Sequence, residues 1–422
     1  MTSAADLVDR FGSPLYVYDL DRVDAALRQL RAVLPAPSTI YYSLKANPHP
    51  YLVEALLSSG CRAEVSSAGE LATAVAAGAA GSGCLYTGPG KTPGELAVAM
   101  RSGVRRFCVE SPTDFARVAT AAHMQGVTAD CLVRVNIAGT TGGAALRMTG
   151  GASQFGIDEE QLSAHPEGFA DRSGARLVGA HFFPMSNARS QSSLIDAMTA
   201  GLRAAARLRD EVGLPMLAVD LGGGFAAPYA APGQLPTYPG LQRQLRALLD
   251  RYLPGWRGGG VDVSFESGRY LVGTAGRLVC TVVDTKRSRN RQYVVLDSGI
   301  NHLGGLTGLG RLMPVKLTTV ESRSTSPATL VGPLCTPADV LAPSTGVGAA
   351  QIGQVVEVPN VGAYGLTASL IGFLSREAPV EVVTRGGEVI HADQLEVRRQ
   401  APPDRVTAPH ATLADSPATP SS

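Results

Sequence analysis

The sequence has no excess of charge of either sign. Its 37 lysine and arginine residues nearly balance its 36 aspartate and glutamate residues, which gives a net charge of +1. Binding of nucleic acid or another polyanion through long-range electrostatics requires a clear positive excess. We therefore expect no nucleic-acid partner.

Long apolar runs and a signal peptide are also missing. A transmembrane helix requires about 18 to 20 consecutive apolar residues, and no such stretch occurs in the chain. The N-terminus shows no charged and apolar segment of the kind that directs secretion. These absences predict a cytoplasmic protein that has no membrane partner.

Cysteine pairs at metal-binding or redox spacing are absent. The chain has 6 cysteines, none of them in a Cys-x-x-Cys pair, and scattered reduced thiols are typical of the cytosol. Four of them lie in or beside expected strands and are interpreted as small core residues, whereas Cys335 is the exception. The four are Cys61, Cys84, Cys108 and Cys131.

The chain is long and contains many apolar residues. With 422 residues, 45% of them hydrophobic, it can build two substantial cores. Before residue 270, strand-like segments alternate with stretches such as Pro50 to Ser59 and Gly69 to Ala77, whose composition suits helices. Eight such units predict a TIM (β/α)8 barrel, in which the active site lies at the C-terminal ends of the strands. The segments are Thr39 to Leu44, Ala63 to Ser66, Cys84 to Thr87, Arg106 to Val109, Cys131 to Asn136, Val178 to Phe183, Leu217 to Leu221 and Val261 to Phe265.

The pattern changes after about residue 270, where strand-like segments follow one another with few helix signals. This change predicts a second, all-β domain, and the early segment Pro14 to Tyr18 could belong to it. We expect a barrel over residues 20–268, a β barrel or sandwich formed by residues 1–19 and 269–400, and a disordered tail over residues 401–422. The later β segments are Arg277 to Asp284, Gln292 to Asp297, Gly353 to Val358 and Val380 to Thr384.

Lys45 is one of only 4 lysines in the chain, which has 33 arginines. It ends the apolar and aromatic run from Tyr41 to Leu44, so its amine is expected at the end of a buried strand. Desolvation there lowers the pKa of an amine, and the neutral form can attack a carbonyl or hold a Schiff base. The alternative is a lysine that extends past the strand end into solvent and has no chemical role.

Six short motifs stand at expected strand ends and in the β domain. They are Tyr42 to Asn47, Glu64 to Leu71, Asp220 to Phe225, Glu266 to Arg269, Cys335 to Asp339 and Gly362 to Gly365. In this order, over about residues 10 to 395, they resemble the fold-type III decarboxylases that use pyridoxal 5′-phosphate (PLP), the family of diaminopimelate and ornithine decarboxylases. A single motif is weak, but all six in order are highly specific.

The resemblance implies that PLP is the cofactor. Lys45 would hold it as an aldimine, and Glu266 would face its pyridine nitrogen and keep that nitrogen protonated. His181 would stack on the ring, and glycines would let backbone N–H groups approach the phosphate. The expected cofactor contacts are Lys45, Arg134, His181, Ser186, Gly222, Gly223, Gly224, Glu266, Gly268, Arg269 and Tyr364.

The expected phosphate site departs from the family pattern at two places. A usual Gly-Ser-Gln is Met185-Ser186-Asn187 here, and the proline of Glu-Pro-Gly-Arg is Ser267. Ser186 keeps the hydroxyl, but Met185 lacks the backbone freedom of glycine. These differences put the geometry of the loop in question.

The motif with Cys335 and Asp339 lies far along the chain from the barrel. In the resembled family this segment reaches the active site of the other subunit, which implies a homodimer with shared sites. Cys335 would return a proton to Cα after CO₂ departs, which suits a thiol with a pKa near about 8.5. The alternative is a buried structural thiol. Thr336, Asp339 and Phe373 are expected to contact the substrate.

The substrate is expected to be an amino acid, and Thr336 bears on which one. Diaminopimelate decarboxylases carry a glutamate here that binds the distal amine, and residues 298–306 lack their Arg-Pro element. The chain looks more like a subgroup linked to natural-product and exopolysaccharide pathways, some of whose members are similar to enzymes that accept an amino acid attached to an acyl carrier protein. We favour that subgroup, with meso-diaminopimelate decarboxylation as the alternative.

Two other classes stay open. An amino-acid racemase of the same fold type would need a second base and would have no use for a Cys-x-x-x-Asp loop. A non-catalytic PLP-binding regulator would be expected to lose Lys45, Glu266 or Cys335, and all three are present.

Overall fold

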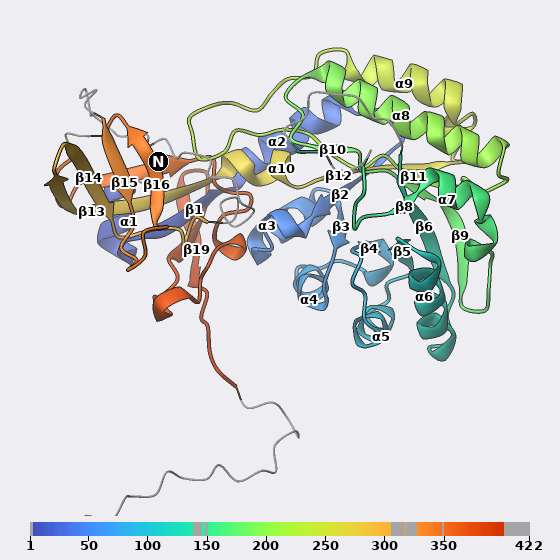
Figure 1. The fold of residues 1–422 in the computed structure, drawn as a ribbon, viewed down its shortest axis with the longest axis horizontal. Coiled ribbons are helices and arrows are strands. Elements are labelled where there is room, and N and C mark those ends of the chain that lie inside the picture. The colour runs from blue at the N-terminus through green and yellow to red at the C-terminus, as the bar shows by residue number, and fades with distance from the viewer. Residues whose placement is uncertain are drawn as a thin grey trace, which may run out of the picture.

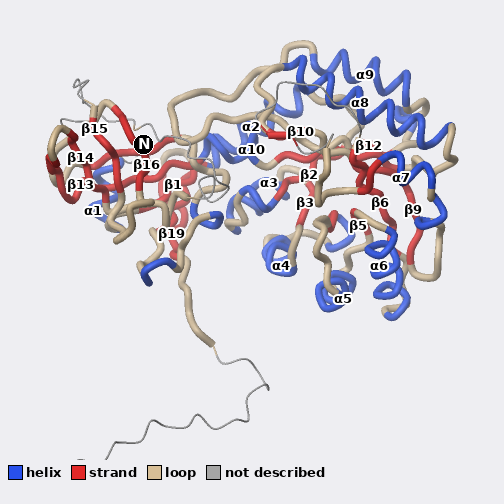
Figure 2. The backbone as a smooth tube through the Cα atoms, viewed as in Figure 1, coloured by secondary structure: helices blue, strands red, loops and turns tan. Residues whose placement is uncertain are grey.

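The computed structural model describes residues 3–137, 146–147, 151–304, 317, 327–347 and 350–400. The expected tail over residues 401–422 therefore lies outside the described residues, as do Gly305 and Leu306 of the element expected near the substrate. Two large sheets lie side by side, and nearly all of the helices surround the sheet on the right of Figures 1 and 2.

The first sheet is a closed barrel of eight parallel strands, which confirms the predicted TIM barrel. Around the barrel the order is β5, β4, β3, β2, β12, β11, β9 and β6, and the pairing of β5 with β6 closes it. All eight expected segments form barrel strands, with ends that differ by a few residues. The strands are β2 (Thr39–Ser43), β3 (Arg62–Val65), β4 (Cys84–Tyr86), β5 (Arg106–Val109), β6 (Ala129–Asn136), β9 (Ala175–His181), β11 (Ala218–Asp220) and β12 (Asp262–Ser267).

Helices alternate with these strands, and side-chain caps fix where several of them begin. The hydroxyls of Ser67, Thr92 and Ser111 each accept a hydrogen bond from a backbone N–H in the first helical turn. Such caps satisfy donors that would otherwise lack partners at a helix start. The helices are α2 (Leu20–Val33), α3 (Pro50–Ser58), α4 (Ala68–Ala76), α5 (Pro93–Arg101), α6 (Pro112–Met124), α7 (Glu159–Ala164), α8 (Gln191–Asp210), α9 (Leu241–Tyr252) and α10 (Arg269–Val272).

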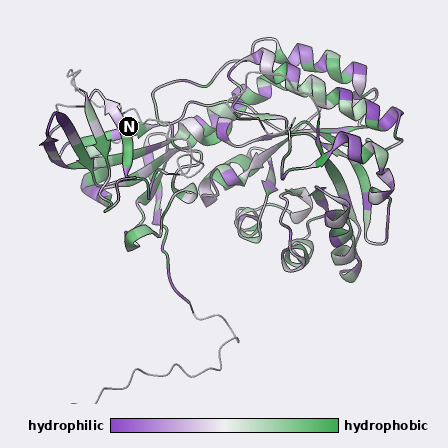
Figure 3. Ribbon diagram, in the orientation of Figure 1, coloured by the Kyte–Doolittle hydropathy of each residue, from purple (hydrophilic) through white to green (hydrophobic). Residues whose placement is uncertain are grey.

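Apolar side chains fill the barrel and the layer between barrel and helices. In Figure 3 the barrel strands are mostly green, whereas α8 and α9 carry purple residues along the outside of the molecule. Five cysteines are buried and Cys335 is exposed, as the sequence predicted for the four near the barrel. One layer inside the barrel consists of Tyr41, Leu85, Cys108, Leu132, Val178 and Ala218.

The second sheet has eight strands and forms the predicted β-rich unit. The early strand β1 pairs antiparallel with β13 and parallel with β18, so the N-terminal segment lies inside this sheet. The residue boundaries of the two domains stay a prediction. The strands are β1 (Leu15–Asp19), β13 (Gly276–Ser288), β14 (Arg291–Leu296), β15 (Ala328–Val331), β16 (Val340–Thr345), β17 (Val355–Pro359), β18 (Val380–Arg385) and β19 (Glu388–Gln394).

Smaller elements complete the chain. Helix α1 (Ala4–Phe11) begins with a capping box between Ser3 and Asp6 and packs on the β sheet through Leu7. Short strands are β7 (Leu146–Arg147), β8 (Ile157–Asp158) and β10 (Met185–Ser186). Among the helices that the structure describes, none combines the length and apolar character needed to cross a membrane.

Candidate active site

Lys45 lies at the C-terminal end of barrel strand β2, in a single helical turn formed by Leu44–Ala46. Its Nζ lies 3.1 Å from Oε2 and 3.3 Å from Oε1 of Glu64, which stands near the end of the neighbouring strand β3. The turn is held in place because the backbone N–H of Tyr364 donates to the carbonyl of Ala46 over 2.7 Å. Lys45 is therefore positioned at the barrel rim, where the sequence predicted it.

The charge state of Lys45 differs from the expectation. Burial by itself lowers the pKa of this amine, but the carboxylates of Glu64 and Glu266 outweigh burial and raise it above its ordinary value. The side chain is also 40% exposed, so desolvation is incomplete. The prediction of a lowered pKa for Lys45 is wrong, because the sequence pattern did not reveal that Glu64 lies beside its amine.

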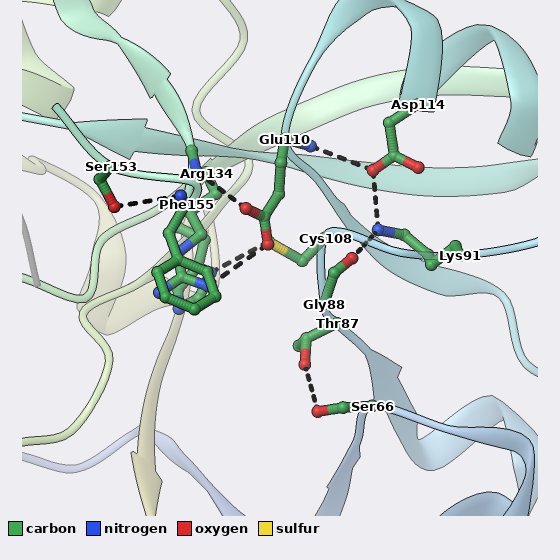
Figure 4. Close-up of polar contacts among 12 residues, drawn as sticks. Ser66, Thr87, Gly88, Lys91, Cys108, Glu110, Asp114, Arg134, Ser153 and Phe155 are labelled. Carbon is green, nitrogen blue, oxygen red and sulfur yellow. Dashed lines mark hydrogen bonds and ion pairs between the residues drawn. The ribbon is translucent and has the colours of Figure 1, made fainter. Parts of the chain in front are cut away.

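Glu64 is a buried partner that the sequence reasoning missed. Its side chain is 1% exposed, and Oε1 accepts hydrogen bonds from the hydroxyls of Thr87 and Ser66. Those two hydroxyls lie 3.1 Å apart, and a dashed line marks their contact in Figure 4. The sequence held one clue to Glu64. It is an acidic residue at the end of an apolar strand segment, in a motif to which no role was assigned.

Glu266 and His181 form a buried pair deeper in the barrel. Nε2 of His181 lies 3.2 Å from Oε1 of Glu266, and Nδ1 lies 3.0 Å from the thiol sulfur of Cys108. Burial raises the pKa of Glu266, but His181, Lys45 and Arg134 outweigh it and lower the pKa to about 2. For His181, burial lowers the pKa, and its contacts with Cys108 and Glu266 raise it well above the ordinary value. Glu266 is therefore held as a carboxylate.

Asp220 supports the glycine turn next to this pair. One carboxylate oxygen accepts the backbone N–H of Gly222 at 2.7 Å, and the other accepts the hydroxyl of Ser264 at 2.7 Å. Gly222 has φ +65° and Gly224 has φ +100°, a backbone region that side chains rarely adopt. A Cβ built at Gly223 would lie 2.5 Å from the carbonyl oxygen of Glu266. The run therefore requires glycine at each of its three positions.

A pocket at the barrel rim brings most of the predicted cofactor residues together. A Cβ built at Gly268 would meet the Cβ of Ala46 at 2.6 Å, so only glycine allows the chain after β12 to pack this closely on the turn that carries Lys45. The guanidinium of Arg269 lies 4.7 Å from the ring centre of Tyr364. The hydroxyl of Ser267, at the family's proline position, is buried and has no hydrogen-bond partner. The lining residues are Ser43, Lys45, Phe183, Ser186, Gly223, Gly224, Phe225, Glu266, Ser267, Gly268, Arg269 and Tyr364.

These features fit a phosphorylated pyridine aldehyde such as PLP. The glycines leave room for a group that approaches the backbone closely, Arg269 brings a cation, and Lys45 brings an amine. Glu266 brings a buried carboxylate, and Ser267 brings an unused hydroxyl. The donor set matches the chemistry of each part of that cofactor.

Arg134 does not line the pocket, although the sequence predicted it as a cofactor contact. Its guanidinium pairs with Oε1 of Glu110 at 3.3 Å, a contact drawn in Figure 4. Glu110 also accepts the backbone N–H of Gly156 at 2.8 Å. The guanidinium also lies 4.7 Å from the ring centre of Phe155. Arg134 thus connects β6 to the loop that precedes β8.

Lys91 is the natural comparison for Lys45, because it also follows a barrel strand. Its side chain is 1% exposed, and Nζ lies 2.7 Å from the Asp114 carboxylate at the start of α6 (Figure 4). Nζ also donates to the carbonyl of Gly88. This enclosed ion pair leaves Lys91 without access to a small molecule.

The residues expected to act on the substrate lie on the β-rich unit and do not line the pocket of the same chain. Cys335 and Thr336 belong to the loop between β15 and β16, and Phe373 belongs to the segment before β18. Asp339 is buried and anchors that loop, because its carboxylate accepts the backbone N–H groups of Ile300 and Leu334 at 2.9 and 2.8 Å. Contact of these residues with a substrate stays a prediction.

Comparison with known proteins agrees with this geometry. Residues 20–273 match the family model described as "Pyridoxal-dependent decarboxylase, pyridoxal binding domain". The L-glutamyl-[BtrI acyl-carrier protein] decarboxylase of Niallia circulans is 32% identical, over 90% of this chain and 91% of its own length. The diaminopimelate decarboxylase of Deinococcus radiodurans is 30% identical, over 94% of this chain and 96% of its own.

A solved structure extends the agreement to the fold. The lysine decarboxylase of Selenomonas ruminantium matches with a TM-score of 0.75 and 27% identity, and the match covers 90% of this chain and 94% of that one. Both the barrel and the β-rich unit are therefore shared with this enzyme. The chain belongs to the family of pyridoxal-dependent amino-acid decarboxylases and uses pyridoxal 5′-phosphate as its cofactor.

Proposed function

We propose that this enzyme removes the α-carboxylate of an amino-acid unit carried as a thioester on an acyl carrier protein. Lys45 anchors the cofactor, and Cys335 of the partner subunit protonates Cα. The observation that carries the anchoring role is the position of Lys45, the one lysine that lines the glycine-rich pocket at the barrel rim within the described part of the chain.

The acids around Lys45 control its proton. Glu64 is fixed by two hydroxyls and lies 3.1 Å from Nζ, so it is placed to accept the proton that the ammonium must lose before the amine can attack a carbonyl. Glu64 is nearly inaccessible to water, so within the pair it is Lys45 that solvent and an entering ligand can reach.

Glu266 supplies a fixed negative charge deeper in the site. Its low pKa keeps it ionised at neutral pH, and the ionised form favours a protonated pyridine nitrogen in a ligand bound above it. Bound in this pocket, PLP supplies the electron sink that accepts the electron pair left when CO₂ departs. His181 holds the Glu266 carboxylate in place through the contact of 3.2 Å.

On this proposal the proton that replaces CO₂ comes from the other subunit. Cys335 is exposed on the loop between β15 and β16, and the buried carboxylate of Asp339 holds that loop in a defined shape. An exposed thiol on an anchored loop suits delivery of a proton into a second subunit, and we propose a homodimer with shared sites for this reason.

Thr336 supports the choice of substrate. It carries no charge, so it cannot pair with a second ammonium group at the far end of a diamino acid. The relative from Niallia circulans acts, by its name, on a glutamyl unit bound to a carrier protein, and its alignment covers nearly the whole of both chains. A glutamyl or similar thioester presents no distal ammonium.

The second candidate is decarboxylation of meso-diaminopimelate. It is favoured by the relative from Deinococcus radiodurans, which is nearly as similar and covers slightly more of the chain. The decarboxylase family itself argues against the racemase and regulator alternatives.

A substrate panel separates the two candidates. Purified enzyme loaded with PLP is incubated with free glutamate, free meso-diaminopimelate, and both amino acids bound to a carrier protein, and mass spectrometry records loss of CO₂. Preference for the carrier-bound glutamyl unit supports the proposal. Efficient turnover of free meso-diaminopimelate by the unmodified enzyme contradicts it and supports the second candidate.

A further inference from the structure

A second group of titratable side chains lies away from the pocket, where the β18–β19 hairpin meets the segment that follows Lys45. It comprises His49, Glu381 and Asp393. Each offers one nitrogen or oxygen atom that can bind a metal ion, and these three atoms all lie within 4.8 Å of one another. His49 directly precedes α3, Glu381 lies in β18 and Asp393 lies in β19. We propose that these three side chains bind a divalent transition-metal ion of the zinc class.

The two carboxylates are placed where they repel each other. Glu381 and Asp393 are direct partners across the antiparallel strands β18 and β19. Like charges directly opposite in this way destabilise a strand pair. The hairpin therefore needs a cation at this point if both groups are to be charged.

The imidazole of His49 faces the same point without a good partner. The residue is 5% exposed, and neither ring nitrogen makes a hydrogen bond. Its Nε2 lies 3.4 Å from Oδ1 of Asp393, beyond the usual hydrogen-bond length of about 2.9 Å. A tetrahedral ion with bonds of about 2.0 to 2.1 Å separates its ligand atoms by about 3.4 Å. The separation suits two ligands of one ion better than a hydrogen bond.

Hydrogen bonds already orient both carboxylates. The hydroxyl of Tyr18 donates to Oε1 of Glu381 over 2.7 Å, and Nε2 of His391 lies 3.1 Å from Oδ2 of Asp393. Contacts of this kind fix metal-binding carboxylates in productive orientations. The Asp393 side chain is 43% exposed, which gives an ion a path from solvent and leaves room for water as a further ligand.

The donor set selects the class of ion and its effect. An imidazole nitrogen with two carboxylates suits zinc and its transition-metal neighbours, whereas magnesium and calcium prefer oxygen ligands throughout. A bound ion would connect the chain just after Lys45 to the β18–β19 hairpin. Because the unfolded chain offers no such arrangement, the ion would stabilise the folded protein.

Metal binding can be measured on the full chain without an affinity tag. PLP is first fixed to the enzyme by borohydride, so that free cofactor cannot chelate metal. The protein is then treated with a chelator to strip bound metal, and the chelator is removed by dialysis. Titration with zinc sulfate should show about one ion per chain by calorimetry, and thermal unfolding should shift to higher temperature. Cobalt at the same site should give a visible absorption band.

Two variants and a control locate the site. Asp393→Asn changes a half-exposed residue, so it should fold and bind zinc at least about tenfold more weakly. His49→Gln should have the same effect, whereas His165→Gln changes an exposed histidine paired with Glu167 and should bind like the wild type. Absence of zinc binding by the wild type overturns the proposal. Equal affinity in the wild type and Asp393→Asn also overturns it, since the ion would then lie elsewhere.

Discussion

Nζ of Lys45 lies 3.1 Å from Oε2 of Glu64, across the ends of adjacent strands β2 and β3. The register of these strands, in which Ser43 lies opposite Glu64, brings the two side chains together. The barrel therefore presents its amine beside a buried carboxylate.

Glu64→Gln should shift the pH dependence of cofactor loading. The Glu64 carboxylate is the largest of the charges that raise the pKa of Lys45, so its removal lowers that pKa and makes the neutral amine available at lower pH. The rate at which the visible absorption band of bound PLP forms is measured against pH. Glu160→Gln, an exposed change on α7, serves as control. An unchanged profile in Glu64→Gln would remove Glu64 from this role.

Borohydride reduction should leave PLP attached to Lys45. The purified protein should be yellow, lose its visible band on reduction, and yield one modified peptide that contains Lys45. Lys45→Ala should abolish the covalent link. Recovery of the adduct on Lys91 would contradict the assignment, and the ion pair of Lys91 with Asp114 gives the physical reason to expect none there.

Cys335→Ala should lower turnover by about 10²-fold or more and leave PLP content unchanged, since a positioned acid contributes about that factor. Cys61→Ala, a buried thiol outside the pocket, is the matched control and should keep its turnover. Full activity of Cys335→Ala would exclude the thiol from the reaction.

Subunit exchange tests whether two chains share a site. Lys45→Ala and Cys335→Ala should each be nearly inactive, and a mixture allowed to exchange subunits should regain part of the activity. A mixed dimer would contain one site with both the lysine and the thiol. Mass spectrometry is used to prove that the subunits have exchanged. If no activity returns after exchange, both groups act within one chain.

Glu381→Gln should stabilise the chelator-treated protein at alkaline pH. Burial raises the pKa of Glu381 from an ordinary value near about 4.3 to about 7. Ionisation of Glu381 therefore destabilises the folded protein. This loss of stability is absent below the ordinary pKa and complete above the pKa in the folded protein. The free energy of unfolding in urea should therefore fall less for the variant than for the wild type between pH 5 and pH 8. Glu396→Gln, at an exposed position, should behave like the wild type. Parallel pH curves for Glu381→Gln and the wild type would contradict the burial argument.

Much of the fold was predictable because its signals are local. Several of the eight barrel strands were marked by continuous β-branched or aromatic runs, since parallel strands covered on both faces favour apolar residues throughout. Strands β15, β16 and β19 were not predicted. Pro343 interrupts the strand pattern of β16, and β19 is largely exposed, so its residues are not selected for a core.

Parts of the site were predictable where the type of residue and its place at a strand end indicate a specific chemical role. Gly223, Gly224, Lys45 and Glu266 line one pocket, and their contact with the cofactor stays a prediction. Their electrostatic neighbours were not predictable, because Glu64, Cys108 and Glu110 act through contacts between strands that sequence order does not reveal. This is why the pKa of Lys45 was predicted in the wrong direction.

Thr336→Glu tests the proposed substrate preference from the protein side. A glutamate could pair with a distal ammonium, and such contacts are worth roughly 1.5–3 kcal/mol, or about ten- to a hundredfold in selectivity. The variant should gain activity on meso-diaminopimelate relative to the wild type, measured as kcat/KM. No gain would mean that Thr336 does not face the far end of the substrate.

The mass of a glutamyl-loaded carrier protein before and after treatment with the enzyme tests the central claim most directly. The account predicts that the wild-type enzyme lowers this mass by one CO₂, and that Lys45→Ala leaves it unchanged. A carrier mass that stays unchanged with wild-type enzyme, under conditions where free meso-diaminopimelate is converted rapidly to lysine, would contradict the account.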